Sequence, residues 1–242
     1  MLRRVSTGIP GMDALIEGGV PKGSILVLCG CPGSGKTLFA AKFIYEGATR
    51  FKEHGVYVCL TESRDVFVDT MRLYGWDFEE LTNRRLVEIL DLSIETELDA
   101  QSALNRIVDA INRLKADRLV LDSVTALGLG LRDELSRRHF LRLLYRVLRK
   151  FGCTALLIVE VPSNYSAFGS RMEEFIADGI IHLTHYYDEK GVLRRMLRIF
   201  KMRGTNHGCR TYEYRITEKG IEILGLEAKL RRPAETRPEE IN

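Results

Sequence analysis

The feature that most constrains the fold of this chain is a glycine-rich run from Gly30 to Thr37, which fits the pattern G-x-x-x-x-G-K-[ST] at every constrained position. Its glycines let the backbone curl until successive N–H groups point at one anion. Lys36 adds a positive charge for the β- and γ-phosphates of a nucleotide, and the Thr37 hydroxyl can ligate Mg²⁺. A helix that begins near Gly35 directs its positive end at the same phosphates. The run therefore predicts a phosphate-binding loop with these contact residues: Gly33, Ser34, Gly35, Lys36 and Thr37.

The segments on either side of this loop are of the types that such a site needs. The apolar run at residues 25–29 precedes the loop and is typical of a buried strand. Residues 38–53 follow it, with apolar side chains such as Phe39, Phe43 and Ile44 at helical spacing. Strand, loop and helix occur in the required order. We therefore predict an intact nucleotide site rather than a structural glycine-rich turn.

Beyond this unit, strand and helix patterns alternate along most of the chain. Short apolar runs typical of buried strands lie at residues 56–60, 86–90, 118–121 and 154–160. Helical patterns lie between them, at residues 65–74, 97–115 and 132–151. Alternation of this kind favours a parallel sheet with helices on both faces. We therefore predict an α/β fold with a mostly parallel central sheet flanked by helices.

The pattern changes after this alternating region. Residues 179–187, 192–202, 210–217 and 220–224 are typical of strands joined by short turns, with turn chemistry at 188–191 and 218–220. We expect them to add antiparallel strands to one edge of the sheet. Residues 227–242 are charged and contain Pro233 and Pro238. We therefore expect one domain over residues 1–226 and a flexible tail over residues 227–242.

Composition limits the remaining classes of protein. A chain of 242 residues with 45% hydrophobic content can build one large core. The net charge of +3 argues neither for nor against nucleic-acid binding. No apolar stretch is long enough to cross a bilayer, and residues 1–8 lack the apolar core of a signal peptide. We expect a cytoplasmic protein that does not associate with membranes.

The cysteines and histidines show no metal-ligand spacing. Cys29, Cys59 and Cys153 lie in or beside strand-like runs and are expected in the core. An odd count of five cysteines without paired spacing disfavours a zinc site or a disulfide framework. We interpret the remaining candidates as structural or surface residues: His54, His139, His182 and His185.

Two carboxylates complete the predicted site. A phosphate loop needs an acid on the Mg²⁺ side at the end of a neighbouring buried strand, and Asp122 ends the apolar run at 118–121. With Thr37 it forms the predicted magnesium site; the alternative is a strand-end cap. Hydrolysis also needs a group that orients or deprotonates water. Glu62 follows the strand at 56–60 and is our candidate, with Lys36, for the catalytic residues; the alternative is a solvated acid beside the next helix.

Several further segments resemble the KaiC-like ATPases of the RecA superfamily. They occur in family order at residues 6–13 (STGIPGMD), 18–24 (GGVPKGS), 75–77 (GWD), 121–127 (LDSVTAL) and 173–179 (EEFIADG). The run at 201–207 (KMRGTNH) closely matches the family's K-x-R-G-T-x-H motif. The resemblance covers roughly residues 5–225. The clock protein of that family has two such modules in tandem, whereas this chain resembles a single-module relative.

This resemblance implies a RecA-like P-loop fold that binds ATP with Mg²⁺ between the subunits of a homo-oligomeric, usually hexameric, ring. It implies that Lys201 and Arg203 contact the neighbour's phosphates, with Thr205 and His207 nearby. A cation supplied across an interface neutralises charge on the transferred phosphoryl group, so the role is chemically sensible. The alternative is an edge strand whose basic residues deter aggregation.

The chain departs from the family pattern at one position. Relatives usually carry two adjacent glutamates where this chain has Thr61 and Glu62. The first, important for water activation, is Thr61 here, and loss of a general base typically lowers the rate by about 10²–10⁴-fold. Two hypotheses remain: a slow Mg-dependent ATPase, or a module that binds ATP to control assembly or a protein client with little hydrolysis.

Nucleic acid is a possible but not a favoured partner. RecA relatives often bind DNA through loops that correspond to residues 123–134 and 161–171 here. In the second, Tyr165 and Phe168 could stack on bases and Arg171 could contact a phosphate. One helix face is also basic, and we interpret it as a solvated or inter-subunit face rather than a phosphate-binding one. That face contains Arg138, Arg142, Arg146 and Arg149.

Overall fold

The computed structural model describes residues 2–93, 100–129, 134–162 and 176–224. Its strands are β1 (Arg4–Val5), β2 (Val20–Pro21), β3 (Ile25–Gly30), β4 (Gly55–Cys59), β5 (Val87–Asp91), β6 (Arg118–Asp122), β7 (Thr154–Glu160), β8 (Gly179–Tyr187), β9 (Leu193–Met202), β10 (Thr211–Thr217) and β11 (Gly220–Ile223). Its helices are the 3₁₀ turn η1 (Asp13–Ile16), α1 (Lys36–Phe51), α2 (Arg64–Arg72), α3 (Phe78–Asn83), α4 (Ala100–Leu114), α5 (Val124–Leu129) and α6 (Glu134–Phe151).

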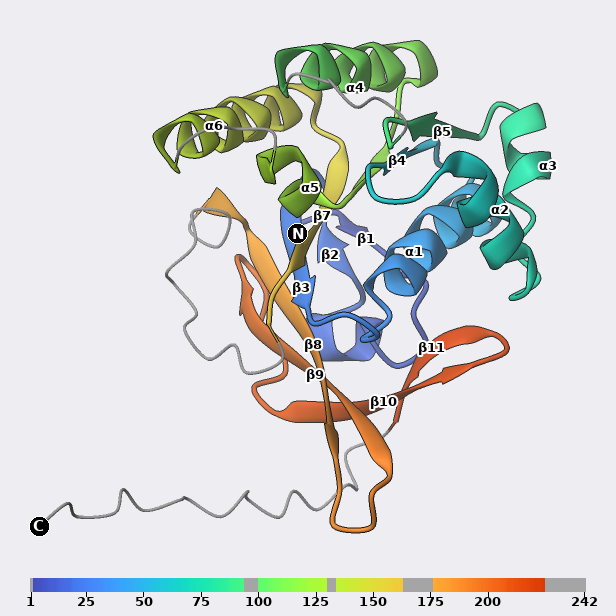
Figure 1. Ribbon diagram of the computed structural model, residues 1–242, viewed down its shortest axis with the longest axis vertical. Helices are drawn as coiled ribbons and strands as arrows, with labels where there is room; N and C mark the ends of the chain where they lie inside the picture. The colour runs from blue at the N-terminus through green and yellow to red at the C-terminus, as the bar shows by residue number, and fades with distance from the viewer. Residues whose placement is uncertain (1, 94–99, 130–133, 163–175, 225–242) are drawn as a thin grey trace, which may run out of the picture.

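One nine-stranded sheet organises these elements, in the order β11-β10-β9-β8-β3-β7-β6-β4-β5 (Figure 1). From β8 to β5 the neighbouring strands are parallel. The strands β9, β10 and β11 then add to the β8 edge as an antiparallel meander. The predicted α/β fold with antiparallel strands at the C-terminal edge is therefore confirmed.

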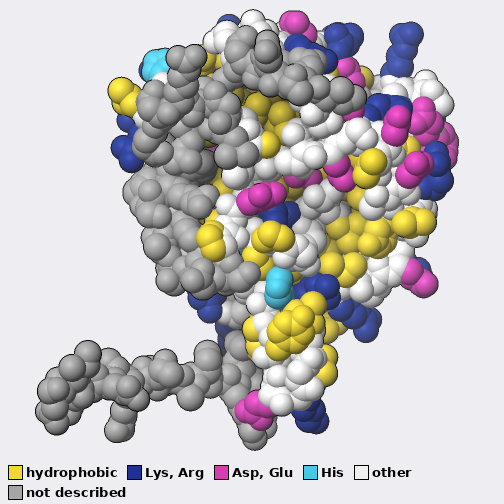
Figure 2. All heavy atoms as spheres, viewed as in Figure 1, with side chains coloured by type: hydrophobic (Ala, Val, Ile, Leu, Met, Phe, Trp, Pro, Cys, Tyr) yellow, Lys and Arg dark blue, Asp and Glu magenta, His cyan; other side chains and the backbone are white. Residues whose placement is uncertain are grey.

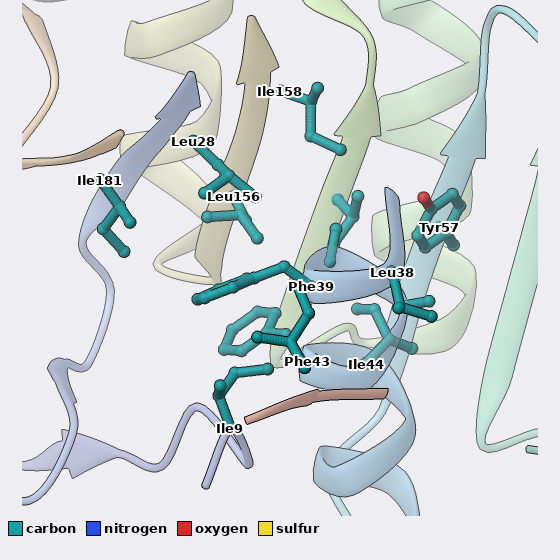
Figure 3. Close-up of a cluster of buried hydrophobic side chains, with 14 of the residues drawn as sticks. Ile9, Leu28, Leu38, Phe39, Phe43, Ile44, Tyr57, Leu156, Ile158 and Ile181 are labelled. Atoms are coloured by element: carbon teal, nitrogen blue, oxygen red, sulfur yellow. The ribbon is translucent and has the colours of Figure 1, made fainter. Parts of the chain in front are cut away.

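Helices cover both faces of the parallel region. The core on one face contains side chains of α1, α2 and α3 packed on the sheet. The core on the other face contains side chains of α4, α5 and α6. Figure 3 shows Phe39 and Phe43 of α1 beside Leu28 and Leu156 of β3 and β7. Strands covered on both faces need apolar residues at successive positions, which explains the continuous runs in β3 and β6.

Local signals explain where several helices begin. The Ser63 hydroxyl accepts from the backbone N–H of Val66 at the start of α2. The Asp77 carboxylate accepts from the backbone N–H of Glu80, at 2.9 Å, at the start of α3. Gly35, in the left-handed region, precedes α1 without a side-chain cap. The orphan N–H groups of α1 are thus left beside the phosphate loop.

Most predicted elements match the structure within a few residues, and the differences lie in short helices and in the two-residue strands β1 and β2. The prediction did not include α3 or the paired strands β1 and β2. A loop was expected at residues 123–134, ahead of and overlapping the start of the predicted helix at 132–151, but residues 124–129 of it form the helix α5. A helix of six residues shows too few turns for apolar periodicity to stand out. The predicted tail at 227–242 lies outside the described residues.

Two other sequence expectations concern burial and membranes. Cys29, Cys59 and Cys153 are buried, as expected, and all five cysteines are free thiols. Within the described ranges, no helix combines the length and apolar character of a membrane span.

Candidate nucleotide-binding site

The glycine-rich loop follows the carboxyl end of β3, in the middle of the large sheet. Gly33 and Gly35 have φ angles of +78° and +85°, which residues with a side chain rarely adopt. The Ser34 hydroxyl donates to the carbonyl of Cys31 at 2.7 Å and closes the loop on itself. The glycine spacing in the sequence therefore corresponds to a real backbone requirement.

Lys36 begins α1 and points back into the loop. Its ammonium donates to the carbonyl of Cys31 at 3.0 Å, and the residue is only 8% exposed. Burial lowers the pKa of Lys36, while the negative charges of Glu160 and Asp122 oppose that shift. The lysine is thus a desolvated cation that faces two acids at the edge of the sheet where β3, β6 and β7 end.

Asp122 lies at the carboxyl end of β6 and accepts two hydrogen bonds on one oxygen. The Thr37 hydroxyl and the Tyr57 hydroxyl both donate to its Oδ2 at 2.7 Å. Burial raises the pKa of Asp122, and these two hydrogen bonds and Lys36 act against that shift. The structure thus brings the two predicted metal-site residues together. Their hydroxyl and carboxylate oxygens are ligands of the kind that Mg²⁺ prefers.

Thr61 and Glu62 follow β4, the next strand beyond β6. The backbone N–H of Leu60 donates to the carbonyl of Asp122 at 2.8 Å, which holds this segment against the end of β6. Glu62 is half-buried, and its pKa is raised by burial first and by the charge of Asp122 second. Thr61 is exposed. Glu62 therefore lies at the carboxyl end of the parallel strands, as the phosphate loop does.

The K-x-R-G-T-x-H run at residues 201–207 lies near the amino ends of the parallel strands, opposite the phosphate loop. Leu26 of β3 pairs with Gly179 of β8, which in turn pairs with Met202 of β9. Gly30, where the loop begins, pairs with Leu183, four residues and roughly 13 Å further along the strands. The structure therefore does not bring the run to the phosphate loop of the same chain.

Three side chains of this run contact groups of the same chain. The Arg203 guanidinium lies 3.4 Å from Asp178 Oδ1. The Thr205 hydroxyl accepts from Arg4 at 2.9 Å. His207 Nδ1 lies 3.2 Å from the carbonyl of Gly208. Burial, followed by the nearby charge of Arg203, lowers the pKa of Lys201.

Sequence reasoning missed several residues that support the phosphate loop. The sequence predicts Tyr57 only as part of the strand at 56–60. Tyr214 of β10 is buried and its hydroxyl donates to the carbonyl of Ser34. His185, interpreted as structural or surface, has Nδ1 3.3 Å from the Cys31 thiol within the loop. Nothing in the sequence marks these partners, because each lies far along the chain from the group that it contacts.

Most of the candidate DNA-binding segment at 161–171, with Tyr165, Phe168 and Arg171, lies outside the described residues. Figure 2 shows acidic and basic side chains intermixed over α2 and α3. These helices carry the ion pairs Arg64–Glu79, Arg72–Asp69 and Arg84–Glu80. They therefore do not offer a uniformly basic surface.

The predicted basic face of α6 is partly engaged within the chain. The Arg149 guanidinium pairs with Asp178 and with the hydroxyl of Tyr145. Arg142 and Arg146 are exposed. Of the four arginines, Arg149 is therefore held by contacts within the chain.

A phosphate loop after a central parallel strand, with an acid at the end of a nearby strand, defines the class of P-loop nucleotide-binding proteins with a RecA-like sheet. The family model for the KaiC ATPases matches residues 5–228. This chain belongs to the KaiC family of ATPases, which confirms the resemblance of its motifs.

Individual relatives agree with this assignment. The chain is 34% identical over 237 residues to a UPF0273 protein of Methanocaldococcus jannaschii, with 92% of this chain and 96% of that protein covered. It is 33% identical over 236 residues to the circadian clock oscillator protein KaiC of Synechococcus elongatus, covering 94% of this chain but 45% of KaiC. The crystal structure of a KaiC-like protein from Pyrococcus horikoshii superposes with a TM-score of 0.85 at 38% identity, covering 93% of this chain and 100% of that one.

These lengths agree with a single module. The chain spans nearly all of the UPF0273 protein and of the solved KaiC-like protein, but about half of the clock protein.

Proposed function

We propose that this chain is a slow Mg-dependent ATPase that holds ATP between the subunits of a homo-oligomeric ring. Six subunits are expected from its resemblance to the KaiC-like ATPases. The observation that carries the proposal is the separation of two half-sites. The phosphate loop, Asp122 and Glu62 lie at the carboxyl edge of the parallel strands, and the run at 201–207 lies at the amino edge. Because the two half-sites lie at opposite ends of the parallel strands, they can meet only between copies arranged head to tail.

Each half-site has a distinct part in the reaction. The backbone N–H groups of the loop and Lys36 bind the β- and γ-phosphates. Glu62 orients a water molecule and takes its proton as the water oxygen bonds to the γ-phosphorus and the bond to ADP breaks. Arg203 and Lys201 of the neighbouring copy neutralise the charge on the transferred phosphoryl group, with Thr205 and His207 beside them.

Magnesium fits the donor set of this site. Thr37 and Asp122 would hold the ion, the acid through water, and Mg²⁺ would neutralise charge shared by the β- and γ-phosphates. Tyr57 keeps the Asp122 carboxylate in place, since its hydroxyl donates to the same oxygen as Thr37. The protein residues would therefore orient the ion, and the ion would supply positive charge.

The second candidate is a module that binds ATP to control its own assembly or a protein client. Thr61, where relatives usually have a glutamate, favours this reading because a threonine hydroxyl cannot act as the general base for water. Under this reading ATP changes the mass of the assembly even where turnover is absent. DNA binding is a third and weaker candidate.

The test is ATP turnover per subunit measured over a range of protein concentrations, with Lys36→Ala as the blank. Turnover that rises as subunits associate is the result expected of a site completed between copies. ATP binding without turnover above the blank, with a mass that changes on adding ATP in light scattering, would favour the assembly module. Turnover that is independent of concentration in a protein that stays monomeric would contradict the ring.

A further inference from the structure

We propose that Asp178 is a positioning residue for Arg203, and that Arg149 keeps the Asp178 carboxylate paired when Arg203 moves to the neighbour's phosphate. This inference rests on the proposed function, because the transfer of Arg203 to a neighbouring site is part of it. It adds two residues to that site, one of them on a helix that the reaction does not otherwise use.

Asp178 is fixed to the strand that leads into the phosphate loop. The residue directly precedes β8 and is only 6% exposed. Its Oδ2 accepts from the backbone N–H of Ile25, the first residue of β3, at 2.9 Å. Its own backbone N–H donates to the carbonyl of Ile25 at 2.8 Å. The carboxylate therefore has a defined position relative to β3.

The other oxygen of Asp178 faces two guanidinium groups. Arg203 approaches Oδ1 to 3.4 Å, and its backbone N–H donates to the Asp178 carbonyl at 2.8 Å. Arg149 of α6 pairs with the same Oδ1. One buried carboxylate therefore sets the direction of the arginine that the proposed function assigns to the neighbour's phosphates.

The two arginines are not held equally. Arg149 also donates to the hydroxyl of Tyr145, at 2.9 and 2.8 Å, and its guanidinium lies 5.1 Å from the Tyr145 ring centroid. The Arg203 side chain is 56% exposed, and Asp178 is the only partner of its guanidinium among the described residues. Arg203 is thus the arginine that can move away from Asp178, whereas Arg149 remains paired with it.

The reason for two partners is the energetic cost of an unpaired buried charge. A carboxylate as buried as Asp178 is strongly destabilising when its last cation is removed. Because Arg149 remains, Arg203 can exchange Asp178 for a phosphate without leaving that charge unpaired. Asp178 thereby orients the Arg203 side chain, and the free-energy cost of separating the two residues is low.

The decisive experiment is a double-mutant cycle on ATP turnover in the assembled protein, with Arg203→Ala, Asp178→Asn and the double variant. We expect Asp178→Asn to lower kcat by about tenfold with little change in KM, a coupling of the size seen for contacting residues. The double variant is expected to be no slower than Arg203→Ala alone. Asparagine keeps an oxygen that can accept from Ile25, and the melting temperature checks that the fold is retained.

Two outcomes separate the failure of this inference from that of the proposed function. If Arg203→Ala leaves turnover unchanged, the transfer of Arg203 between subunits fails, and this inference falls with it. If Arg203→Ala slows turnover but the losses of the two variants multiply, Asp178 acts independently of Arg203 and only this inference is overturned.

A second comparison tests Arg149 and remains informative if Asp178→Asn does not fold. Arg149→Ala is expected to lower kcat severalfold, because Asp178 then depends on Arg203 alone. Arg146→Ala is the matched control, since Arg146 is exposed on the same helix. Equal turnover in the two variants would overturn the role given to Arg149.

Discussion

At the scale of single residues, the properties of the site come from ionisable groups that are buried beside one another. Asp122, Glu62 and Lys36 all have pKa values shifted by burial, and each shift disfavours the charged form. The two hydroxyls that donate to Asp122 oppose this effect for that residue. The charge state of the site therefore depends on a few specific hydrogen bonds.

Tyr57→Phe tests one of these hydrogen bonds. Removing a donor from the ionised carboxylate destabilises that form, so the already raised pKa of Asp122 rises further. Only the ionised form can assist Mg²⁺, so the acid limb of the turnover–pH profile should move to higher pH. Loss of the buried hydrogen bond should also lower stability by about 1 kcal/mol. Tyr186→Phe, at an exposed position, is the control; an unmoved acid limb in Tyr57→Phe would contradict the prediction.

Glu62→Gln tests the proposed base. Turnover should fall by about 10²–10⁴-fold, with ATP binding retained, because glutamine cannot take a proton from water. In the unsubstituted protein, turnover should decline as pH falls through a value above the ordinary glutamate pKa, since burial and Asp122 raise the pKa of Glu62. Phosphate release is the measurement, with Asp69→Asn on the exposed side of α2 as control. Unchanged release in Glu62→Gln would remove Glu62 from the mechanism.

At the scale of elements, the antiparallel hairpin of β10 and β11 supports the phosphate loop. Tyr214 donates to the Ser34 carbonyl, and a Cβ at Gly35 would lie 3.0 Å from Ile216 Cδ1 and 3.3 Å from Ile221 Cδ1. The strands added to the sheet edge thus contact the loop directly, at residues far apart in the sequence.

A matched pair of glycine substitutions measures this support. Gly33→Ala and Gly35→Ala impose a similar positive φ, which costs about 1–3 kcal/mol in each case. A Cβ at Gly33 meets nothing within 4 Å, whereas one at Gly35 meets the isoleucines of the hairpin. Gly35→Ala should therefore lower the free energy of unfolding by more than Gly33→Ala does. Equal losses in chemical denaturation would mean that the hairpin does not constrain the loop.

Elements were predicted from the sequence according to their length and position. The strand β7 was predicted at its observed bounds because it is a continuous apolar run, and β8 because turn residues at 188–191 follow it. The short helices α3 and α5 were missed, because six residues give too little periodicity. The cap at Asp77 was the available signal for α3, since its side chain accepts from Glu80.

At the scale of the whole molecule, the position of the two half-sites on opposite edges leads to the last prediction. Mixing Lys36→Ala with Arg203→Ala subunits should raise turnover above that of either variant alone. An Arg203→Ala subunit keeps its phosphate loop, and a Lys36→Ala neighbour supplies the missing arginine. Random mixing in a head-to-tail ring leaves about a quarter of the sites intact. Phosphate release after co-refolding is the measurement, and recovery no greater than in either pure variant would contradict a shared site.

The phosphate loop, the acid that follows the apolar run of β6 and the family resemblance could all be predicted from local sequence patterns. These features consist of contiguous residues at fixed spacing, so the chemistry can be read without knowing which strands are neighbours. The candidate residues Lys36, Thr37 and Asp122 were all identified in this way.

Which of these groups come into contact could not be predicted from the sequence, because the contacts depend on the order of the strands. The order of strands in the sheet brings Tyr57 into contact with Asp122, 65 residues away in the sequence, and Tyr214 into contact with Ser34 of the loop, 180 residues away. It also separates the run at 201–207 from the loop of its own chain and surrounds Asp178 with two arginines. The physical reason is that strand pairing is set by the packing of both cores at once, which no local pattern in the sequence records.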